Sequence, residues 1–487
     1  MKLFKSLHSV TGTVIAVFFF MWFATGLVLI YHPYPRLDDG MENHNRETIE
    51  ADSLRPLAYY ADSLVRDTIQ SVRLVQRVGQ PLVQISTADS SYTFCADTTE
   101  KRNKVTFDYC VAQASKWVTG RPARVDTLHE RVQWILYERY ERAMPIYRLT
   151  YDDADGHELF VSGKNGEVQQ VTTRSQRIWA WLGAIPHKFY YPCIRKDVDL
   201  WKTVITIGGI LCLLCALSGV VHGWTLQLRV FRRGRGWKNP FRKPVYKWHH
   251  VLGLVFGLFI LCWGISGSLA MQKVPKWLVP YERDYSMYAP DIWEGDSLPL
   301  RSFRLDYKKV LAHYPDVKQM EWHMIGGKPT YTLVVDSNEV FVDASDTVIR
   351  PLRVEADSVQ VAMQRLYGTD TPVHVELMTA YDQYYMPSFD MTLPLPVYKA
   401  TIGDADGSVY YIGTDTDYCR FFNHNKKVRK WLFGAMHYLN INGLVTRPLL
   451  WHTCIWVLCV GGMIVSFTGI LLGVRYLRRK RKVRLKA

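Results

Sequence analysis

The chain has 487 residues, of which 22% are charged, and a formal net charge of +15. Eighteen of its 60 lysines and arginines lie near the N-terminus, in residues 225–248 and in residues 475–487, which leaves 42 basic against 45 acidic residues elsewhere. Basic clusters beside apolar stretches indicate contact with anionic lipid. This distribution excludes the broad basic surface of a nucleic-acid-binding protein.

Four apolar stretches contain no Lys, Arg, Asp or Glu: residues 9–31, 203–224, 251–271 and 453–474. A helix of about 20 residues rises about 30 Å, which is the thickness of the hydrocarbon core of a bilayer. The stretches therefore predict four transmembrane helices. The first stretch is too long for a signal peptide and lacks a small-x-small cleavage site, so we expect it to remain as an anchor.

The basic clusters predict the orientation of these helices, because Lys and Arg are enriched in cytoplasmic loops. We expect a multi-pass membrane protein with both termini in the cytoplasm and two large external domains. The predicted division is transmembrane helix 1 (1–31), external domain 1 (32–200), transmembrane helix 2 (201–224), a basic loop (225–248), transmembrane helix 3 (249–271), external domain 2 (272–450), transmembrane helix 4 (451–474) and a basic tail (475–487).

The segment that starts at His8 is repeated at His249. KSLHSVTGTV aligns without a gap on YKWHHVLGLV, and the alignment also places Gly12 on Gly253 and Gly26 on Gly267. Later segments continue the match. They pair residues 145–161 with 396–412, 177–189 with 429–439, and 201–219 with 451–469. The chain is therefore predicted to be two tandem repeats of roughly 240 residues related by a pseudo-twofold axis.

Both external segments alternate apolar and polar residues in strand-like runs such as ELFVS and VYYIG, and each also contains a helix-like stretch, at 58–68 and 357–367. This mixture predicts α+β domains with antiparallel sheets. Neither segment contains a nucleophile elbow, a zinc-protease motif or a phosphate-binding loop. The acidic run at Asp152, Asp153 and Asp155 is typical of a hairpin turn, with calcium binding as the alternative. Cys95 and Cys110 could form a disulfide in an oxidising compartment.

Eight histidines are predicted to lie at the ends of the transmembrane helices, in two layers. The cytoplasmic layer contains His8, His222, His249 and His250, and the outer layer contains His32, His187, His437 and His452. A pseudo-twofold axis brings equivalent residues face to face, which pairs His8 with His249 and His187 with His437. Two facing imidazoles are the axial ligands that a six-coordinate haem iron requires. Glycines in the same helices leave room for a flat macrocycle, although close helix packing explains them equally well.

The chain resembles the PepSY-associated transmembrane family over essentially its whole length. The resemblance rests on LHSVTG and WHHVLG at the starts of the odd spans, GAIPH and GAMH before the even spans, and the strand-turn patterns FVSGKNGEV and VFVDASDTV. It implies PepSY-like external domains and an activity similar to that of inner-membrane ferrisiderophore reductases, which carry two b-type haems. The chain departs from the family pattern after the even-span histidines, where PHKFYY and MHYLNING replace His-Thr-Gly.

These observations favour a transmembrane reductase with an inner haem held by His8 and His249 and an outer haem held by His187 and His437. Reserve ligands are His222 and His250 for the inner haem, and His32 and His452 for the outer one. The acceptor would be a ferrisiderophore or another ferric chelate. The cytoplasmic parts are too short for a flavin domain, so the donor would be a membrane quinol or a separate protein.

Two other functions fit parts of the sequence. A non-catalytic membrane adaptor would use its PepSY modules to bind or inhibit a periplasmic partner protein, and it would contain no haem. A transporter accessory would account for the repeat, but no predicted span carries a charged residue for substrate coupling. The presence or absence of haem separates the reductase from the adaptor.

Overall fold

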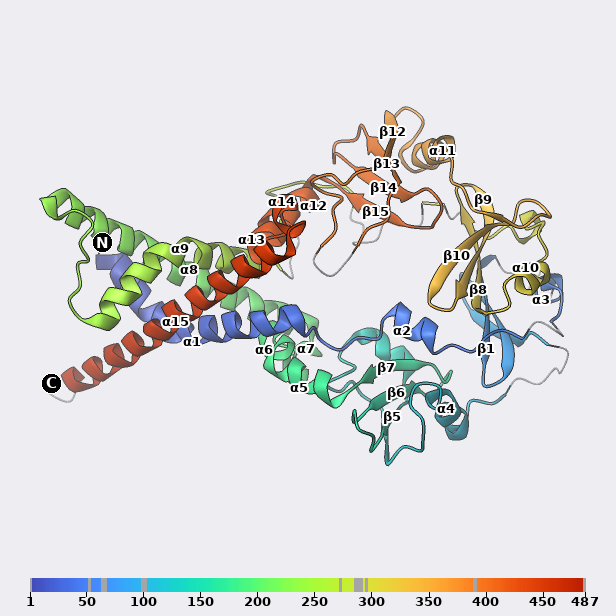
Figure 1. Ribbon diagram of the computed structural model, residues 1–487, viewed down its shortest axis with the longest axis horizontal. Helices are drawn as coiled ribbons and strands as arrows, with labels where there is room; N and C mark the ends of the chain where they lie inside the picture. Colours follow the sequence, from blue (N-terminus) through green and yellow to red (C-terminus); the bar gives the residue numbers. More distant parts are fainter. Residues whose placement is uncertain are drawn as a thin grey trace.

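The computed structural model describes residues 2–50, 54–62, 68–97, 103–270, 274–283, 292–293, 297–388 and 392–484. Within these residues, four helices are long and apolar enough to cross a membrane. They are α1 (Lys2–Tyr31), α8 (Val198–Val230), α9 (Pro244–Leu269) and α15 (Pro448–Arg484). They form a bundle at one end of the molecule, and the sheets lie at the other end (Figure 1).

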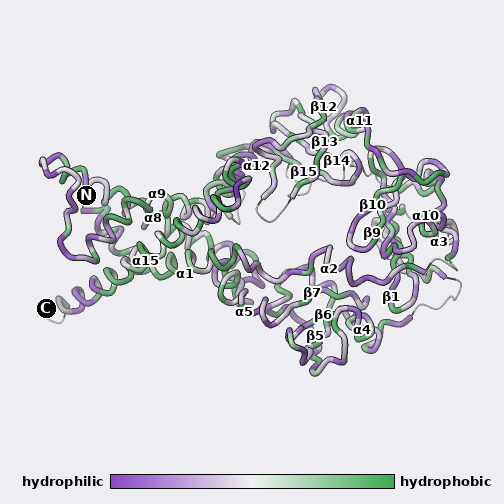
Figure 2. Tube along the Cα trace, in the orientation of Figure 1, coloured by the Kyte–Doolittle hydropathy of each residue, from purple (hydrophilic) through white to green (hydrophobic). Residues whose placement is uncertain are grey.

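The spanning helices begin where the sequence places helix-starting signals. Asp197 caps α8 by accepting hydrogen bonds from the backbone N–H groups of Asp199 and Leu200. Pro244 is the first residue of α9, where its missing N–H costs nothing. The helices extend beyond the predicted spans because flanking polar residues continue them outside the apolar stretch. Hydrophobic residues are concentrated along the bundle (Figure 2), and outward-facing side chains such as Leu258 are 62% exposed, as expected for a lipid-facing surface.

The four helices contact one another in the cyclic order α1–α8–α9–α15. Glycines allow two of these contacts: a Cβ on Gly462 would lie 2.6 Å from the Phe23 ring, and one on Gly461 would lie 2.4 Å from Phe256. Small residues let membrane helices approach closely. Both chain termini and the connection between α8 and α9 lie at the end of the bundle opposite the sheets (Figure 1). The basic segments are therefore gathered at one end.

Two four-stranded antiparallel sheets adjoin the bundle, one from each external segment. The first has the order β4 (Arg124–Leu128), β5 (Ile146–Thr150), β6 (Glu158–Ser162) and β7 (Val168–Thr172), and α4 (Phe107–Ala114) packs on it. The second has the order β12 (Val373–Met378), β13 (Val397–Ile402), β14 (Val409–Gly413) and β15 (Cys419–Phe422), with α11 (Ala356–Tyr367) against it.

A third, seven-stranded sheet contains strands from both external segments. Its order is β11 (Arg350–Pro351), β10 (Asn338–Asp343), β9 (Lys328–Val335), β8 (Val317–Ile325), β1 (Ile69–Arg77), β2 (Gln80–Thr87) and β3 (Ser91–Cys95). β1 pairs with β8 in antiparallel register from Val72 opposite Trp322 to Val75 opposite Gln319. The sequence analysis treats the two external segments as separate modules, whereas the structure joins them. This pairing supplies hydrogen-bond partners to the backbone at the edges of β1 and β8, which would otherwise be unpaired.

Short helices complete the fold. Those in the first half are α2 (Asp39–His44), α3 (Leu57–Asp62), η1 (Glu138–Ala143), α5 (Arg174–Leu182), α6 (Ala184–Lys188), α7 (Pro192–Arg195) and η2 (Phe231–Arg235). Those in the second half are η3 (Leu300–Ser302), α10 (Tyr307–His313), α12 (His424–Arg429), η4 (Lys430–Ala435), α13 (Met436–Tyr438) and α14 (Asn442–Val445). The predicted helix at 357–367 matches α11. The one at 58–68 matches α3 at its start, and residues 63–67 lie outside the described residues.

Cys95 and Cys110 do not form the disulfide considered from the sequence. The Cys95 thiol lies on the seven-stranded sheet and donates a hydrogen bond to Asp97, 2.9 Å away. The Cys110 thiol is buried under the first four-stranded sheet and donates to the carbonyl of Ser162. The two thiols lie at different sheets, and this separation could not be seen in the spacing of the residues along the chain.

Candidate functional site

The structure brings together both histidine pairs expected from the repeat. His8 on α1 faces His249 on α9, with their ring centroids 6.0 Å apart and their ring planes inclined by 35°. His187 on α6 faces His437 on α13, with centroids 6.3 Å apart and planes inclined by 65°. The first pair lies within the helical bundle, and the second lies on short helices next to the sheets.

The outer pair is placed by the same local arrangement in both halves. Each short helix ends two residues after its histidine at a residue with positive φ, Phe189 (φ 52°) in one half and Leu439 (φ 56°) in the other. A tryptophan of the next spanning helix then donates its indole N–H to the last turn of the short helix: Trp201 to the carbonyl of Lys188, and Trp451 to the carbonyl of Tyr438. The short helices are thereby docked on the outer end of the bundle.

All four histidines use Nδ1 in a hydrogen bond to a neighbouring helix. His8 contacts the carbonyl of Cys215 at 3.0 Å, and His249 contacts Oγ1 of Thr468 at 3.0 Å. The outer rings contact hydroxyl groups in the same way: His187 to Thr25 at 3.3 Å, and His437 to Ser266 at 3.1 Å. A hydrogen bond to a carbonyl oxygen requires that Nδ1 carries the proton, and a hydroxyl oxygen can accept a hydrogen bond from the same N–H group. This arrangement leaves Nε2 as the basic nitrogen, as in metal-bound histidines.

Glycines make room for the four rings. A Cβ on Gly219 would lie 2.7 Å from the His8 ring, and one on Gly26 would lie 3.1 Å from the His187 ring. The equivalent positions in the other half are looser, with 3.5 Å between a Cβ on Gly469 and His249 and 3.8 Å between one on Gly267 and His437. Glycine at position 219 is therefore required by the His8 ring, and a side chain at Gly26 would press on the His187 ring.

The spacing within each pair fits two ligands of one metal ion. An imidazole nitrogen lies about 2.0 Å from a coordinated metal, so two rings on opposite sides of one ion have centroids roughly 6.3 Å apart. The observed separations of 6.0 and 6.3 Å are close to this value. Aromatic pairs without a metal also occur at 4.5–7 Å, so the fit to a cofactor depends also on the cavity around the pair.

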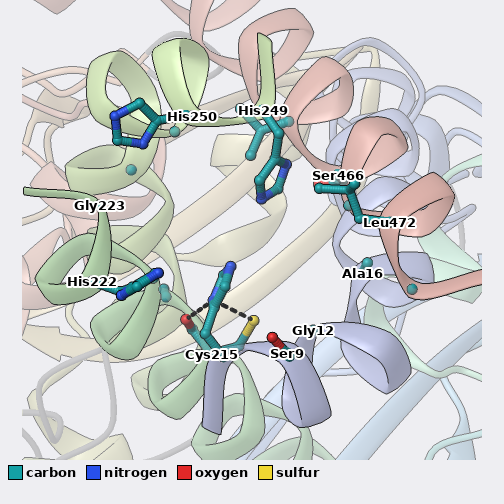
Figure 3. A pocket seen from close by; sticks show the side chains of 18 of the residues that line it. Ser9, Gly12, Ala16, Cys215, His222, Gly223, His249, His250, Ser466 and Leu472 are labelled. Atoms are coloured by element: carbon teal, nitrogen blue, oxygen red, sulfur yellow. Dashed lines mark hydrogen bonds between the residues drawn. The ribbon is translucent and has the colours of Figure 1, made fainter. Parts of the chain in front are cut away.

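A cavity of about 840 Å³ surrounds the inner pair. Its walls come from all four spanning helices and are mostly apolar, with small residues such as Gly12 and Ala16 beside the rings (Figure 3). Two cations, Lys5 and Arg479, line it at the helix ends where the chain termini lie. An apolar cavity with cations at one end fits haem, a flat apolar macrocycle with two carboxylates. The inner pair and its surroundings therefore fit the cofactor.

The reserve histidines of the inner layer are used differently. His250 is buried and contacts Oε1 of Gln227 through Nε2 at 3.1 Å, with its ring edge against Phe241. Figure 3 shows it turned away from His249. His222 also lines the cavity, but its Nδ1 is buried without a hydrogen-bond partner among the described residues. Neither ring faces another histidine across the cavity as His249 does.

The reserve histidines of the outer layer do not form a pair. His32 stacks on Trp179 with centroids 4.1 Å apart, and His452 contacts the hydroxyl of Tyr31 at 3.0 Å. Burial lowers the pKa of the paired His187 to about 3, with smaller contributions from the neighbouring His437 and Lys188, and burial lowers the pKa of His437 to about 4. Both imidazoles are therefore neutral at pH 7, which is the form that binds metals.

The acidic run in the first external segment forms a small cluster. Side-chain ligand atoms of Asp153, Asp155 and His157 lie within 4.8 Å of one another. Asp153 already accepts hydrogen bonds from the backbone N–H of His157 and from its ring at 2.6 Å. The contacts are those of a closed turn, and an exposed acidic cluster does not by itself indicate a metal site.

The sequence analysis missed the groups that orient the histidines. Thr25 and Ser266 occupy equivalent positions in the aligned segments, and both bind an outer imidazole. Trp22 and Trp263 are also equivalent, and each donates its indole N–H to the backbone carbonyl of an outer histidine, at 3.1 and 2.7 Å. The conserved spacing within the chain's own repeat was the signal that could have identified them.

Comparisons with known proteins give one result. A family model described as "PepSY-associated TM region" matches residues 5–479, which is nearly the whole chain. The comparison with curated proteins finds no match.

Proposed function

Because the chain belongs to the PepSY-associated TM family, we propose that it is a haem-containing reductase that moves electrons across the inner membrane to a periplasmic ferric chelate. Its two halves are tandem repeats related by a pseudo-twofold axis. The inner haem is held by His8 and His249, and the outer haem by His187 and His437. The observation that supports this most directly is the pairing of four partly buried imidazoles whose Nδ1 atoms are all engaged.

The proposed topology places the chain termini in the cytoplasm and the sheets in the periplasm. It is supported by the basic residues at the end of the bundle that carries both termini. The inner pair then lies toward the cytoplasm and the outer pair toward the periplasm. The two pairs are ordered along the path that an electron must follow.

The protein's own residues hold, orient and shield the cofactors. His8, held by the Cys215 carbonyl, and His249, held by Thr468, would hold the haem iron through Nε2. Gly219 lets the His8 ring approach α8, and the apolar cavity excludes water. Hydrogen bonds to Nδ1 fix the tautomer and increase the basicity of the ligating nitrogen.

Haem supplies one-electron redox chemistry when it is bound. The overall reaction balances with a membrane quinol as donor: one quinol is oxidised to quinone, two electrons reduce two chelated ferric ions to ferrous ions, and two protons are released. Ferrous iron is held less tightly than ferric iron by hard oxygen ligands, so reduction releases the metal. A separate donor protein is the other possible source of electrons.

The first experiment is an absorption spectrum of the purified full-length protein, oxidised and then reduced with dithionite. The reductase predicts a Soret band, a shift of that band on reduction and two haems per chain. A protein purified from haem-sufficient cells without a Soret band would contradict the proposal. It would favour instead the membrane adaptor, whose external sheets bind a partner protein.

A further inference from the structure

A pocket lined by cations lies between the start of α9 and the last part of α15, at the end of the bundle opposite the sheets (Figure 1). Lys243 directly precedes α9, and Arg475, Arg478 and Arg479 come from α15. The pocket has a volume of about 460 Å³, which is within the range of roughly 300–1,000 Å³ that small-molecule sites occupy. We call it the basic pocket.

No carboxylate neutralises the basic pocket. In the part of the chain that the structure describes, none of its four cationic side chains forms an ion pair or a hydrogen bond. The adjoining sequence supplies no acid either, because residues 225–248 and 475–487 contain no Asp or Glu. All four cations are exposed, so a ligand can reach them from outside the protein. Their positive charge is therefore available to an anion.

The start of α9 adds to the positive potential of the basic pocket. Pro244, Val245 and Tyr246, the first three residues of this helix, line the pocket together with the cations. No side chain caps the helix at Lys243. The first N–H groups of a helix have no partner within the helix, and its dipole places partial positive charge there. An anion in the pocket would meet these groups as well as the four cations.

An exposed apolar surface adjoins the basic pocket on α15. Arg475 directly follows the fourth charge-free stretch, so the pocket lies where the apolar part of the helix ends. Leu471 and Val474 precede Arg475 and Arg478 by four residues each, which places them on the same helix face one turn away, and both are exposed. Cations next to a lipid-facing apolar face lie at the level of the lipid headgroups. A ligand with an anionic head and an apolar tail matches this surface.

We propose that the basic pocket binds the phosphate headgroup of one anionic phospholipid, whose acyl chains lie along the exposed apolar face of α15. Basic pockets between membrane helices are typical sites for such headgroups. Tyr246 and Arg479 line both the basic pocket and the cavity of the inner histidine pair, so the lipid would lie directly beside that cavity. The inference goes beyond the proposed function, because it rests on the protein's own cations and requires no haem.

The test compares two lipids and two double variants of the full-length protein. Native mass spectrometry in detergent counts the bound molecules of phosphatidylglycerol, which is anionic, and of phosphatidylcholine, which has no net charge. The test variant is Arg475→Gln with Arg478→Gln. The control variant is Arg232→Gln with Arg233→Gln, which removes the same charge from exposed positions of η2 at the same end of the bundle, outside the pocket. A competition arm adds inorganic phosphate to the phosphatidylglycerol sample.

We expect the test variant to bind phosphatidylglycerol at least about tenfold more weakly than the unmodified protein does, and the control variant to bind it unchanged. Lys243→Gln, on the opposite wall of the pocket, should weaken binding about fivefold, which separates loss of the site from misfolding of one variant. Equal binding of the two lipids, or equal losses in the test and control variants, would overturn the inference. Displacement of the lipid by inorganic phosphate would overturn it too, because the pocket would then bind a free anion.

Discussion

The inner and outer histidine pairs have similar spacing but are built from different parts of the fold. Both inner histidines, His8 and His249, lie on spanning helices and face a cavity formed by the bundle alone. Both outer histidines lie on short helices that follow the last strand of an external sheet: α6 comes after β7 and α5, and α13 comes after β15, α12 and η4. The bundle therefore determines the inner pair, whereas the outer pair depends on the docking of each external sheet on the bundle.

This difference indicates separate functions for the inner and the outer histidine pair. A site within a rigid bundle is suited to holding a cofactor in constant geometry. A site attached to the sheets is suited to exchange with a ligand outside the membrane. The predictions below ask whether the two pairs behave as independent sites.

The largest expected effect is the loss of one cofactor. His249→Ala and His437→Ala should each remove about half of the bound haem, because each deletes one axial ligand of a different pair. Haem per protein is measured by pyridine haemochromogen assay, and the reduced spectrum identifies the remaining species. His8→Ala should give the spectrum of His249→Ala. Different residual spectra for His8→Ala and His249→Ala would contradict the pairing.

A somewhat smaller effect is expected at the tightest ring contact. Gly219→Ala places a methyl group 2.7 Å from the His8 ring, so the ring must shift, at a cost of about 1–3 kcal/mol. Inner haem binding should weaken and outer haem binding should not. Gly469→Ala is the matched control, because its Cβ would lie 3.5 Å from His249, an ordinary contact. If Gly219→Ala and Gly469→Ala weakened haem binding equally in a haem titration, the His8 ring would not be held in a fixed position.

The loss of a hydrogen bond to Nδ1 is expected to weaken haem binding less than the loss of a histidine ligand. Thr468→Val in the inner site and Ser266→Ala in the outer site should each lower haem affinity about 10–100-fold, because the ring loses its orienting partner. Redox titration should also show a changed midpoint potential for the affected haem alone. Thr453→Val, at a hydroxyl that bonds only to its own helix, is the control. A change in both haems from one substitution would show that the sites are coupled.

The smallest expected effect is on the stability of the seven-stranded sheet, which contributes no residue to either histidine pair. Burial alone would raise the pKa of Glu321, but hydrogen bonding by His323 and the charge of Arg73 lower it to about 2. The ion pair between Arg73 on β1 and Glu321 on β8 therefore stabilises the sheet above pH ~4.5, and this contribution is lost as the pH falls toward 2.

Glu321→Gln should make the unfolding of the external sheets less dependent on pH in this range, with roughly 1 kcal/mol lost at pH 7. Circular dichroism of thermal unfolding at pH 7 and pH 4 measures the difference. Glu376→Gln, at a more exposed ion pair with Lys399, is the control. An unchanged pH profile in Glu321→Gln would show that this pair does not couple the two external segments.

Much of the helical part of the fold and of the site could be predicted from the sequence. The charge-free stretches correspond to four long helices, and the alignment of His8 with His249 predicted a contact between residues 241 positions apart, which the structure contains. The pairing of β1 with β8 could not be predicted, because strand alternation identifies which residues face the core but not which edge meets which. The adjacent His250 was a reserve ligand in the sequence analysis, and its hydrogen bond to Gln227, 23 residues earlier in the chain, could not be predicted.

The sequence by itself determined the number of membrane helices and the two histidine pairs, because hydrophobic length and internal similarity are properties of the chain order. Only the tertiary structure decided what surrounds those pairs: the carbonyl and hydroxyl groups on Nδ1 and the glycines under the rings. Cys215 contributes a backbone carbonyl to His8 from 207 residues away, and a carbonyl is present at every residue. Which carbonyl binds His8 depends on how α1 and α8 pack, so no residue type in the sequence could identify it.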